Sequence, residues 1–143
     1  MPGQTRNKPT ERPDRRDRSA RTTANILRVL RSAKTPMSAY ELLAALRGDR
    51  INAPTTVYRA LAQLIKDGVI HRVESLGAYV VCERATHRHG PTAFAICSDC
   101  GRVNELPSEE VVRRLRRSAT RAGFQVEATM IELTGSCAAC ARQ

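Results

Sequence analysis

Two Cys-x-x-Cys pairs constrain the fold of this chain more than any other feature. The first pair is Cys97 and Cys100, and the second is Cys137 and Cys140. Two cysteines separated by two residues can bind one metal ion from a single turn, and two such pairs complete the tetrahedral shell that zinc prefers. The sequence therefore predicts a four-cysteine structural zinc site. The alternative interpretation is a set of unrelated core cysteines, or two disulfides.

The segment between the two pairs is long enough to form several elements. It contains 36 residues, more than the roughly 15–20 residues of a compact zinc ribbon. The pattern predicts a strand that leads into Cys97, a second strand over residues 103–106 and a helix from Ser108 to Gly123. Alternating apolar residues predict a further strand over residues 124–133. These strands would leave sheet edges open, and a second copy of the chain could pair with them.

The composition limits the class of protein. The chain has 143 residues, of which 41% are hydrophobic and 3% aromatic, without tryptophan. This indicates one ordinary domain or two small ones with a modest aliphatic core. The N-terminus is polar and Arg-rich, unlike a signal peptide, and no apolar run approaches the roughly 18 residues of a membrane span. We expect a cytoplasmic protein with no membrane partner, where cysteines bind metal more often than they form disulfides.

The positive charge is concentrated in the first two thirds of the chain. The net charge of +10 divides into +3 for residues 1–18, +6 for residues 19–92 and +1 for residues 93–143. A basic unit joined to a nearly neutral one indicates a polyanion-binding module attached to an assembly or sensing module. Residues 1–18 contain no Val, Ile, Leu or Phe and are expected to form a disordered basic tail. This tail either contacts DNA phosphates or only increases solubility.

Three helices are expected between residues 19 and 68. Ile26 and Leu30 belong to one apolar helical stripe, which ends before Pro36. Ser38 followed by Glu41 is a capping box for the second helix. The third begins at Pro54, a favoured first helical position. Their lengths and short connections indicate a helix-turn-helix.

The third helix has a polar face suited to DNA. Thr55, Arg59 and Gln63 lie opposite its apolar face, and Tyr58 lies at the border. Arginine reads guanine and glutamine reads adenine in the major groove. The alternative is an ordinary amphipathic helix with a solvated face.

A β-hairpin is expected after the third helix. Residues 70–75 and 78–82 read as two strands around Leu76 and Gly77, which would form the wing of a winged helix. A two-residue loop places His71 opposite Cys82, close enough for both to bind one metal ion. Residues 85–92 are polar, contain Gly-Pro and read as a hinge.

These features together resemble the ferric uptake regulator family, and within it the zinc uptake regulators. The resemblance covers about residues 19–141. The segments that carry it are residues 38–40, 54–61, 70–75, 78–82, 94–103 and 137–140. It implies an α+β fold, with a winged helix-turn-helix domain at residues 19–84, a hinge at 85–92 and a small α/β dimerisation domain at 93–143.

The resemblance also implies the function. The expected protein is a homodimeric, zinc-responsive repressor that binds palindromic double-stranded operator DNA when a hinge zinc site is filled, and controls zinc uptake genes. It would bind two zinc ions per monomer, take no small-molecule substrate and have no enzymatic activity.

The functional residues are carried over by position. The structural zinc ligands are Cys97, Cys100, Cys137 and Cys140. The regulatory zinc ligands are His71, Cys82, His89 and Glu105, with His87 as the alternative hinge histidine. Tyr40 and Arg59 match the family's base-contacting positions. The third helix itself adds four further candidates, so the expected DNA-binding residues are Tyr40, Thr55, Thr56, Tyr58, Arg59 and Gln63. The chain lacks the second His-rich cluster that many iron-sensing relatives carry before the first cysteine pair.

Three other functions remain to be weighed. An iron- or peroxide-responsive regulator would share the fold, but the Cys82 thiolate favours zinc over metals that prefer nitrogen and oxygen ligands. A structural zinc module for protein recruitment would need neither the polar helix face nor the wing. A zinc deaminase requires His-x-Glu and Pro-Cys-x-x-Cys, whereas this chain has His87-Arg88-His89 and no proline before Cys97.

Overall fold

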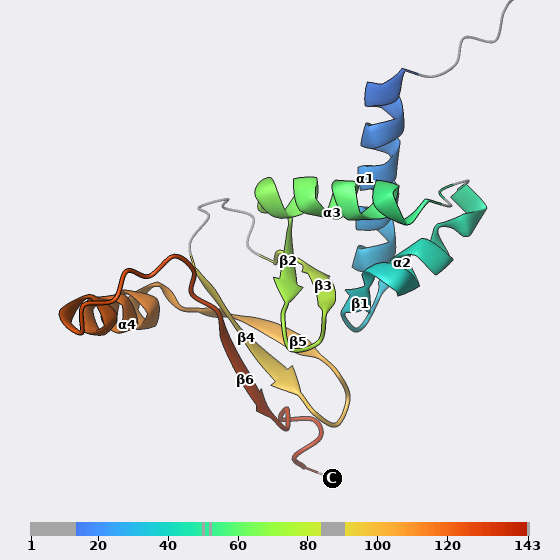
Figure 1. Ribbon diagram of the computed structural model, residues 1–143. Coiled ribbons are helices and arrows are strands. Elements are labelled where there is room, and N and C mark those ends of the chain that lie inside the picture. Colours follow the sequence, from blue (N-terminus) through green and yellow to red (C-terminus); the bar gives the residue numbers. More distant parts are fainter. Residues whose placement is uncertain (1–13, 50, 52, 84–90, 143) are drawn as a thin grey trace, which may run out of the picture.

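The chain folds into two lobes, each built on a three-stranded sheet (Figure 1). The computed structural model describes residues 14–49, 51, 53–83 and 91–142. The elements of the N-terminal lobe are α1 (Arg15–Ser32), β1 (Met37–Ser38), α2 (Ala39–Ala45), the 3-10 helix η1 (Arg47–Asp49), α3 (Pro54–Lys66), β2 (Ile70–Val73) and β3 (Ala78–Val81). Those of the C-terminal lobe are β4 (Thr92–Cys97), β5 (Val103–Pro107), α4 (Glu109–Arg121) and β6 (Ile131–Gly135). None of the described helices is long and apolar enough to span a membrane.

The N-terminal lobe is the predicted winged helix-turn-helix. Its sheet has the order β1-β3-β2 and lies beside the three helices. The capping box is confirmed: the Glu41 N–H donates to the Ser38 hydroxyl, and the Ser38 N–H donates to the Glu41 carboxylate. The side chains that join the helices to the sheet are fully buried: Ile26, Leu42, Leu46, Val57, Leu61 and Ile70.

Helix α1 begins earlier than expected. Residues 15–18 were predicted to belong to the disordered tail, but α1 starts at Arg15. Thr22 and Ile26 are buried and hold the helix against the lobe. Extending an existing helix by one exposed turn is easy because each added residue gains a hydrogen bond without a new nucleation step. The rest of the predicted tail, residues 1–13, lies outside the described residues.

The wing hairpin has a different register from the predicted one. His71 pairs with Val80, not with Cys82, and Val73 pairs with Ala78. The reason is the turn, which spans residues 74–77 and is closed by a hydrogen bond from the Gly77 N–H to the Glu74 carbonyl. Gly77 has a φ of 57°, which glycine adopts without strain. The partner of His71 is thus two residues away from the predicted one. Because side chains alternate with a period of two along a strand, His71 and Cys82 still project from the same face of the hairpin.

The C-terminal lobe has β4 at its centre. This strand pairs antiparallel with β5 and parallel with β6, giving the order β5-β4-β6. Ser108 lies at the predicted N-cap position of α4, but its buried hydroxyl donates to the carbonyl of Pro91 instead of capping the helix. Gly123, with a φ of 80°, ends the helix as predicted.

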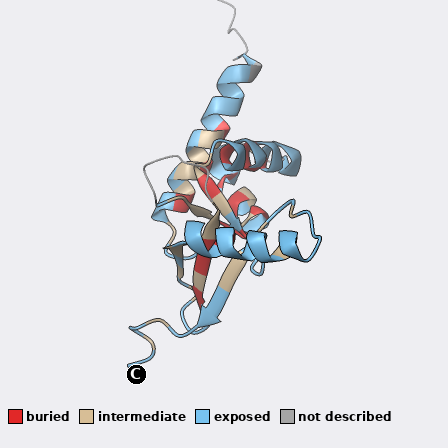
Figure 2. Cartoon of the chain, turned by 90° about the vertical axis from the view of Figure 1, so that its left-hand side faces the viewer, coloured by how far each residue is buried: buried red, intermediate tan, exposed pale blue. Residues whose placement is uncertain are grey.

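The predicted strand over residues 124–130 is absent, and the strand β6 begins only at Ile131. Two of the alternating apolar side chains of this segment are largely exposed in the described part of the lobe, Phe124 at 71% and Met130 at 66%. Helix α4 is also almost entirely exposed (Figure 2), and Val112 is its one buried residue. Val111, Leu115 and Leu133 add to the exposed apolar surface of this lobe. An exposed apolar surface of this kind suits contact with a second copy, which the sequence predicted to pair with the open sheet edges.

A charge placed on this surface should separate the dimer. Leu115 is 52% exposed, so Leu115→Arg should leave the lobe folded. A buried, uncompensated guanidinium at the dimer contact should cost about 3–5 kcal/mol, and sedimentation velocity at micromolar concentration should show a monomer. The matched control is Leu76→Arg, at a wing residue that is 45% exposed. A Leu115→Arg variant that sediments like the Leu76→Arg variant would contradict this placement of the interface.

Candidate metal centres

The sheet register brings the two Cys-x-x-Cys pairs together. Cys97 is the last residue of β4 and pairs with Gly135 at the end of the parallel strand β6. Cys137 and Cys140 follow β6 directly, so both pairs reach the same end of the sheet. One Sγ atom from each of the four cysteines lies within 4.8 Å of the others.

The sulfur distances fit a metal site and not disulfides. The Sγ atoms of Cys100 and Cys137 are 3.9 Å apart. A tetrahedron with Zn–S bonds of about 2.3 Å has edges of about 3.8 Å, whereas a disulfide bond is about 2.05 Å long. None of the five cysteines forms a disulfide. This cluster could therefore hold a zinc ion with little rearrangement.

The protonation of the cluster also suits a cation. Backbone N–H groups of Cys137 and Cys100 lower the pKa of the Cys97 thiol to about 6, and the Cys137 N–H lies 3.2 Å from this sulfur. Hydrogen bonds with the sulfurs of Cys137 and Cys100 raise the pKa of Cys140 to about 12. The cluster therefore combines a thiol that ionises easily with one that keeps its proton. A divalent cation would replace the thiol protons and remove the repulsion among the sulfurs.

A second cluster joins the two lobes. His71 comes from β2, Cys82 follows β3, and Glu105 comes from β5; their candidate ligand atoms lie within 4.8 Å of one another. The His71 Nε2 atom is 3.9 Å from Glu105 Oε1. The Glu83 N–H donates to Glu105 Oε2 over 3.2 Å, which orients the carboxylate. Three of the four predicted regulatory ligands therefore meet, and both candidates for the fourth, His89 and His87, lie outside the described residues.

The surroundings of this cluster include residues that sequence reasoning missed. The Phe94 ring contacts the His71 imidazole edge to face, with ring centroids 5.7 Å apart and an interplanar angle of 61°. Val73 of the wing is fully buried against Phe94 and Ile96 of β4. Beside the four-cysteine cluster, a side chain at Gly101, the residue after Cys100, would touch Thr35 of the N-terminal lobe. No local motif marks these contacts, because they depend on how the lobes are placed.

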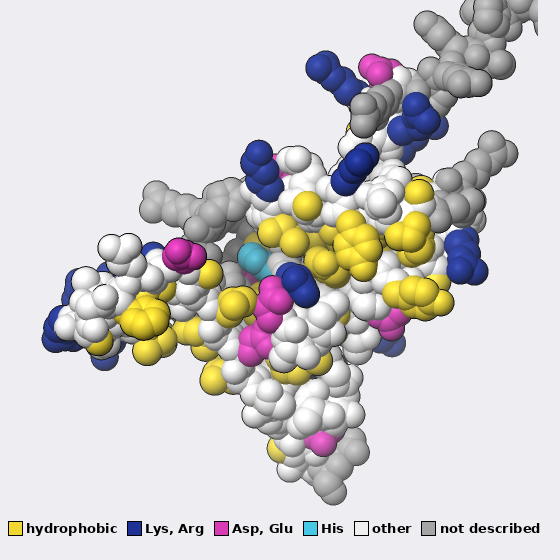
Figure 3. Space-filling view, in the orientation of Figure 1, with side chains coloured by type: hydrophobic (Ala, Val, Ile, Leu, Met, Phe, Trp, Pro, Cys, Tyr) yellow, Lys and Arg dark blue, Asp and Glu magenta, His cyan; other side chains and the backbone are white. Residues whose placement is uncertain are grey.

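The predicted DNA-binding residues form an exposed surface on the N-terminal lobe. Tyr40 at the start of α2 is 74% exposed and Tyr58 on α3 is 58% exposed. The remaining four residues of α3 are exposed as well: Thr55, Thr56, Arg59 and Gln63. Lys and Arg side chains are spread along α1 and around this lobe (Figure 3). The surface thus combines exposed aromatic and polar groups with positive charge.

Two of these residues also face helix α1. Thr56 and Arg59 line a groove of about 370 Å³ together with Arg18 and Thr22 of α1. Gln63 is engaged within its own helix, where its Nε2 atom donates to Asp67 Oδ1 over 2.8 Å. This bond restrains the Gln63 amide, whereas Arg59 has no ion pair with another described residue.

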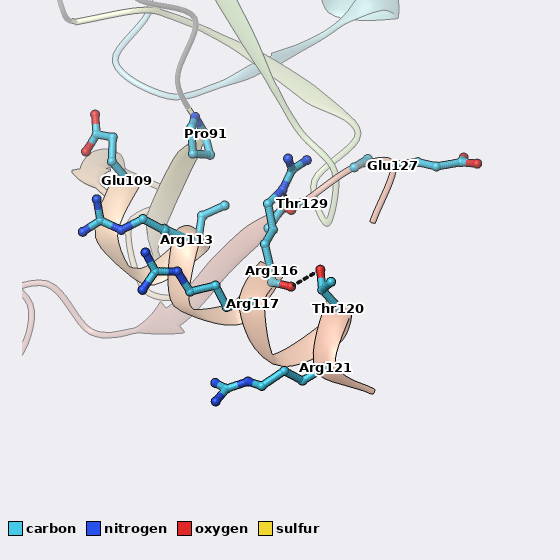
Figure 4. A pocket seen from close by; sticks show the side chains of 11 residues that line it. Pro91, Glu109, Arg113, Arg116, Arg117, Thr120, Arg121, Glu127 and Thr129 are labelled. Atoms are coloured by element: carbon cyan, nitrogen blue, oxygen red, sulfur yellow. Dashed lines mark hydrogen bonds between the residues drawn. The ribbon is translucent and has the colours of Figure 1, made fainter. Parts of the chain in front are cut away.

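A further cavity lies elsewhere, beside α4 (Figure 4). It has a volume of about 1070 Å³ and is lined by Arg113, Arg116, Arg117 and Arg121 of the helix and by the segment around Thr129. The Arg116 Nε donates to the Thr129 hydroxyl over 3.3 Å. Its described lining contains no cysteine or histidine. The cavity and the two cysteine-containing clusters are therefore separate features of the molecule.

Comparison with known proteins identifies relatives across most of the chain. The model of the ferric uptake regulator family matches residues 17–134. The zinc uptake regulation protein of Escherichia coli is 39% identical over 127 residues, covering 86% of this chain and 74% of that protein. The ferric uptake regulation protein of Vibrio anguillarum is 31% identical over 129 residues, covering 86% of this chain and 85% of that protein.

Solved structures show the same likeness. The crystal structure of holo XcZur superposes with a TM-score of 0.78 at 39% identity, covering 85% of each chain. The structure of a zinc uptake regulator complexed with zinc and DNA gives a TM-score of 0.79 at 37% identity, covering 85% of this chain and 81% of that one.

Loss of one thiolate from the four-cysteine cluster should unfold the C-terminal lobe. In small domains, structural zinc contributes about 10–16 kcal/mol to folding, as much as the whole stability of a typical domain. Cys97→Ser should therefore lose the structural zinc, measured by atomic emission, and lower the thermal midpoint. Cys82→Ser is the matched control and should keep the midpoint. If Cys97→Ser retains the wild-type midpoint, the cluster is not a structural site.

Proposed function

The chain belongs to the ferric uptake regulator family, and on that premise we propose that it is a zinc-responsive transcriptional repressor. It acts in the cytoplasm as a dimer, binds palindromic operator DNA when its regulatory site is filled and controls zinc uptake genes. As a member of this family it is a transcription regulator and not an enzyme. The observation that carries the proposal is the cluster of His71, Cys82 and Glu105, which draws ligands from both lobes.

The donor set of this cluster supports zinc as the sensed metal. Thiolate is a soft ligand that suits zinc, while sites built only from nitrogen and oxygen suit iron or manganese. Cys82 supplies this thiolate. The relatives agree, because the zinc uptake regulation protein is more similar to this chain than the ferric uptake regulation protein, at 39% against 31% identity.

Two zinc ions per monomer follow from two separate ligand sets. Cys97, Cys100, Cys137 and Cys140 would hold the structural ion, because four thiolates leave no position open for exchange or sensing. His71, Cys82 and Glu105, together with His89 or His87 of the hinge, would hold the regulatory ion. This second set spans the lobes, so its occupancy can alter their arrangement.

The ligands of the regulatory site link the wing to the dimerisation lobe. His71 and Cys82 belong to the wing hairpin, and Glu105 belongs to β5. A zinc ion bound here would add a bond of fixed length between the lobes. In a dimer, the lobe orientation sets the separation of the two α3 helices, which must match successive major grooves about 34–36 Å apart. Lobes that are free to move would populate this arrangement less, and the apparent DNA affinity would fall in proportion.

The exposed face of α3 would read the DNA. Arg59 would contact a guanine edge, with Thr55, Thr56 and Tyr58 beside it on the same helix. Tyr40 extends the surface from α2. The excess positive charge of residues 19–92 would strengthen binding to any duplex in a salt-dependent way.

Removal of the bridging thiolate should separate folding from regulation. Cys82→Ser should lower the zinc content from about two ions per monomer to about one, while the dimer and its thermal midpoint persist. Fluorescence anisotropy on operator DNA should then show no increase in affinity when zinc is added. In the wild type, operator DNA should tighten zinc binding by the same factor by which zinc tightens DNA binding.

Two results would contradict this assignment. One is a Cys82→Ser variant that still binds the operator in a zinc-dependent manner. The other is a wild-type protein whose operator binding responds to Fe(II) and not to Zn(II), which would favour the iron-responsive alternative.

Loss of a base-reading side chain should weaken operator binding only. Arg59→Ala should cost about 1–3 kcal/mol on the operator, measured by anisotropy at fixed salt and saturating zinc, and should affect nonspecific DNA much less. Arg117→Ala, at an exposed arginine of α4, is the control and should bind the operator like the wild type. Equal losses on operator and nonspecific DNA would show that Arg59 contacts phosphate and does not read a base.

A further inference from the structure

A carboxylate of the C-terminal lobe binds the turn of the wing. Glu132 lies on β6, and its two carboxylate oxygens accept hydrogen bonds from two consecutive backbone N–H groups. The Glu74 N–H donates to Oε1 over 2.6 Å, and the Ser75 N–H donates to Oε2 over 3.0 Å. These bonds join residues nearly sixty positions apart in the sequence, from different lobes.

The sheet register explains why Glu132 reaches the wing. Phe94 of β4 pairs with Glu105 of β5 on one side and with Glu132 of β6 on the other. Residues paired in this way project from the same face of a sheet. Glu105, Phe94 and Glu132 therefore form one row across the three strands. Glu105 faces the metal-binding cluster, Phe94 packs on His71, and Glu132 holds the turn.

The wing turn is built to present these two N–H groups. The Glu74 carbonyl accepts the Gly77 N–H inside the turn, which leaves the N–H groups of residues 74 and 75 directed outward. The Glu74 carboxylate lies 3.4 Å from the Arg72 guanidinium, so this pairing offsets the charge that stands next to Glu132. The Ser75 hydroxyl, with the N–H groups of Ser75 and Glu74, lowers the pKa of Glu132 against the opposing effect of burial.

We propose that Glu132 is a positioning residue that holds the wing docked on the C-terminal lobe without any metal ion. Glu132 is not part of either cluster of candidate metal ligands among the described residues, so it acts through lobe orientation and not through coordination. A docked wing keeps His71 and Cys82 close to Glu105 before zinc arrives. The fraction of molecules whose ligands are already arranged for zinc binding is then larger. The apparent zinc affinity rises in proportion to that fraction.

The decisive variants remove the acceptor while the fold stays intact. This inference rests on the proposed zinc-dependent DNA binding, and operator binding is measured in the full-length dimer over a range of buffered free zinc. Glu132→Ala should raise the free zinc needed for half-maximal binding by about three- to tenfold, the size of about one ordinary net hydrogen bond. Glu132→Gln keeps one carbonyl acceptor and should show a smaller shift. Zinc content at saturation, dimer mass and thermal midpoint should match the wild type.

A matched control separates this role from a general charge effect. Glu127 is an exposed carboxylate on the connection that leads from α4 into β6, and Glu127→Ala should leave the zinc dependence unchanged. An equal shift in Glu127→Ala and Glu132→Ala would overturn the proposal, because both variants change the net charge in the same way.

A cycle with the wing turn tests the contact itself. Ser75 is the second residue of its turn, where proline is favoured, so Ser75→Pro removes both the N–H and the hydroxyl of Ser75 from Glu132 with little cost to the turn. If Glu132 acts through this contact, adding Glu132→Ala to Ser75→Pro should produce a smaller further shift than Glu132→Ala alone. Fully additive shifts would overturn the proposal.

Hydrogen exchange provides a readout that does not depend on zinc sensing or DNA. In the Cys82→Ser background, the amides of Glu74 and Ser75 should exchange about three- to tenfold faster after Glu132→Ala. Unchanged exchange would overturn the proposal even if the protein regulates as expected. Faster exchange in a protein that shows no zinc-dependent DNA binding would support the contact and contradict the proposed function.

Discussion

The parallel pairing of β4 with β6 is the constraint on which the rest of the molecule depends. Parallel strands require a long crossover, and here β5 and α4 supply it. The register of this pair places Cys97 beside the second cysteine pair and Phe94 beside Glu132. One alignment of two strands therefore sets both the geometry of the four-cysteine cluster and the row of side chains that receives the wing. Four thiolates on one ion would lock that alignment at its end.

Sequence reasoning succeeded where the chemistry is periodic or local. The capping box at Ser38, the start of α3 at Pro54 and the cysteine spacing each have a short-range physical cause, and the structure contains all three features. The contact of His71 with Cys82 and Glu105 was also predicted, although the hairpin register was wrong. An error of two residues along a strand keeps a side chain on the same face. The predicted grouping of His71 and Cys82 therefore did not depend on the exact register.

The failures have physical causes as well. Apolar residues alternate over residues 124–130 as they do in a strand. Alternation indicates only that one face of the segment is apolar, and Phe124 and Met130 on that face remain exposed in the described part of the chain. No local sequence pattern indicated the role of Glu132, because the strand that pairs with β6 and the position of the wing both depend on contacts between distant segments. The early start of α1 was missed because an Arg-rich turn without apolar residues reads as disordered, although it extends a helix that buried residues hold in place.

The contact between Glu132 and the wing turn has a consequence for how the wing approaches nucleic acid. A backbone N–H that donates to a carboxylate cannot at the same time donate to a phosphate oxygen. While the N–H groups of residues 74 and 75 are bound to Glu132, the tip of this hairpin has fewer backbone donors for the sugar–phosphate chain. On the proposed function, contacts of the wing with the duplex would then come from its side chains and less from its backbone, so the hairpin would act mainly as a link between the two lobes.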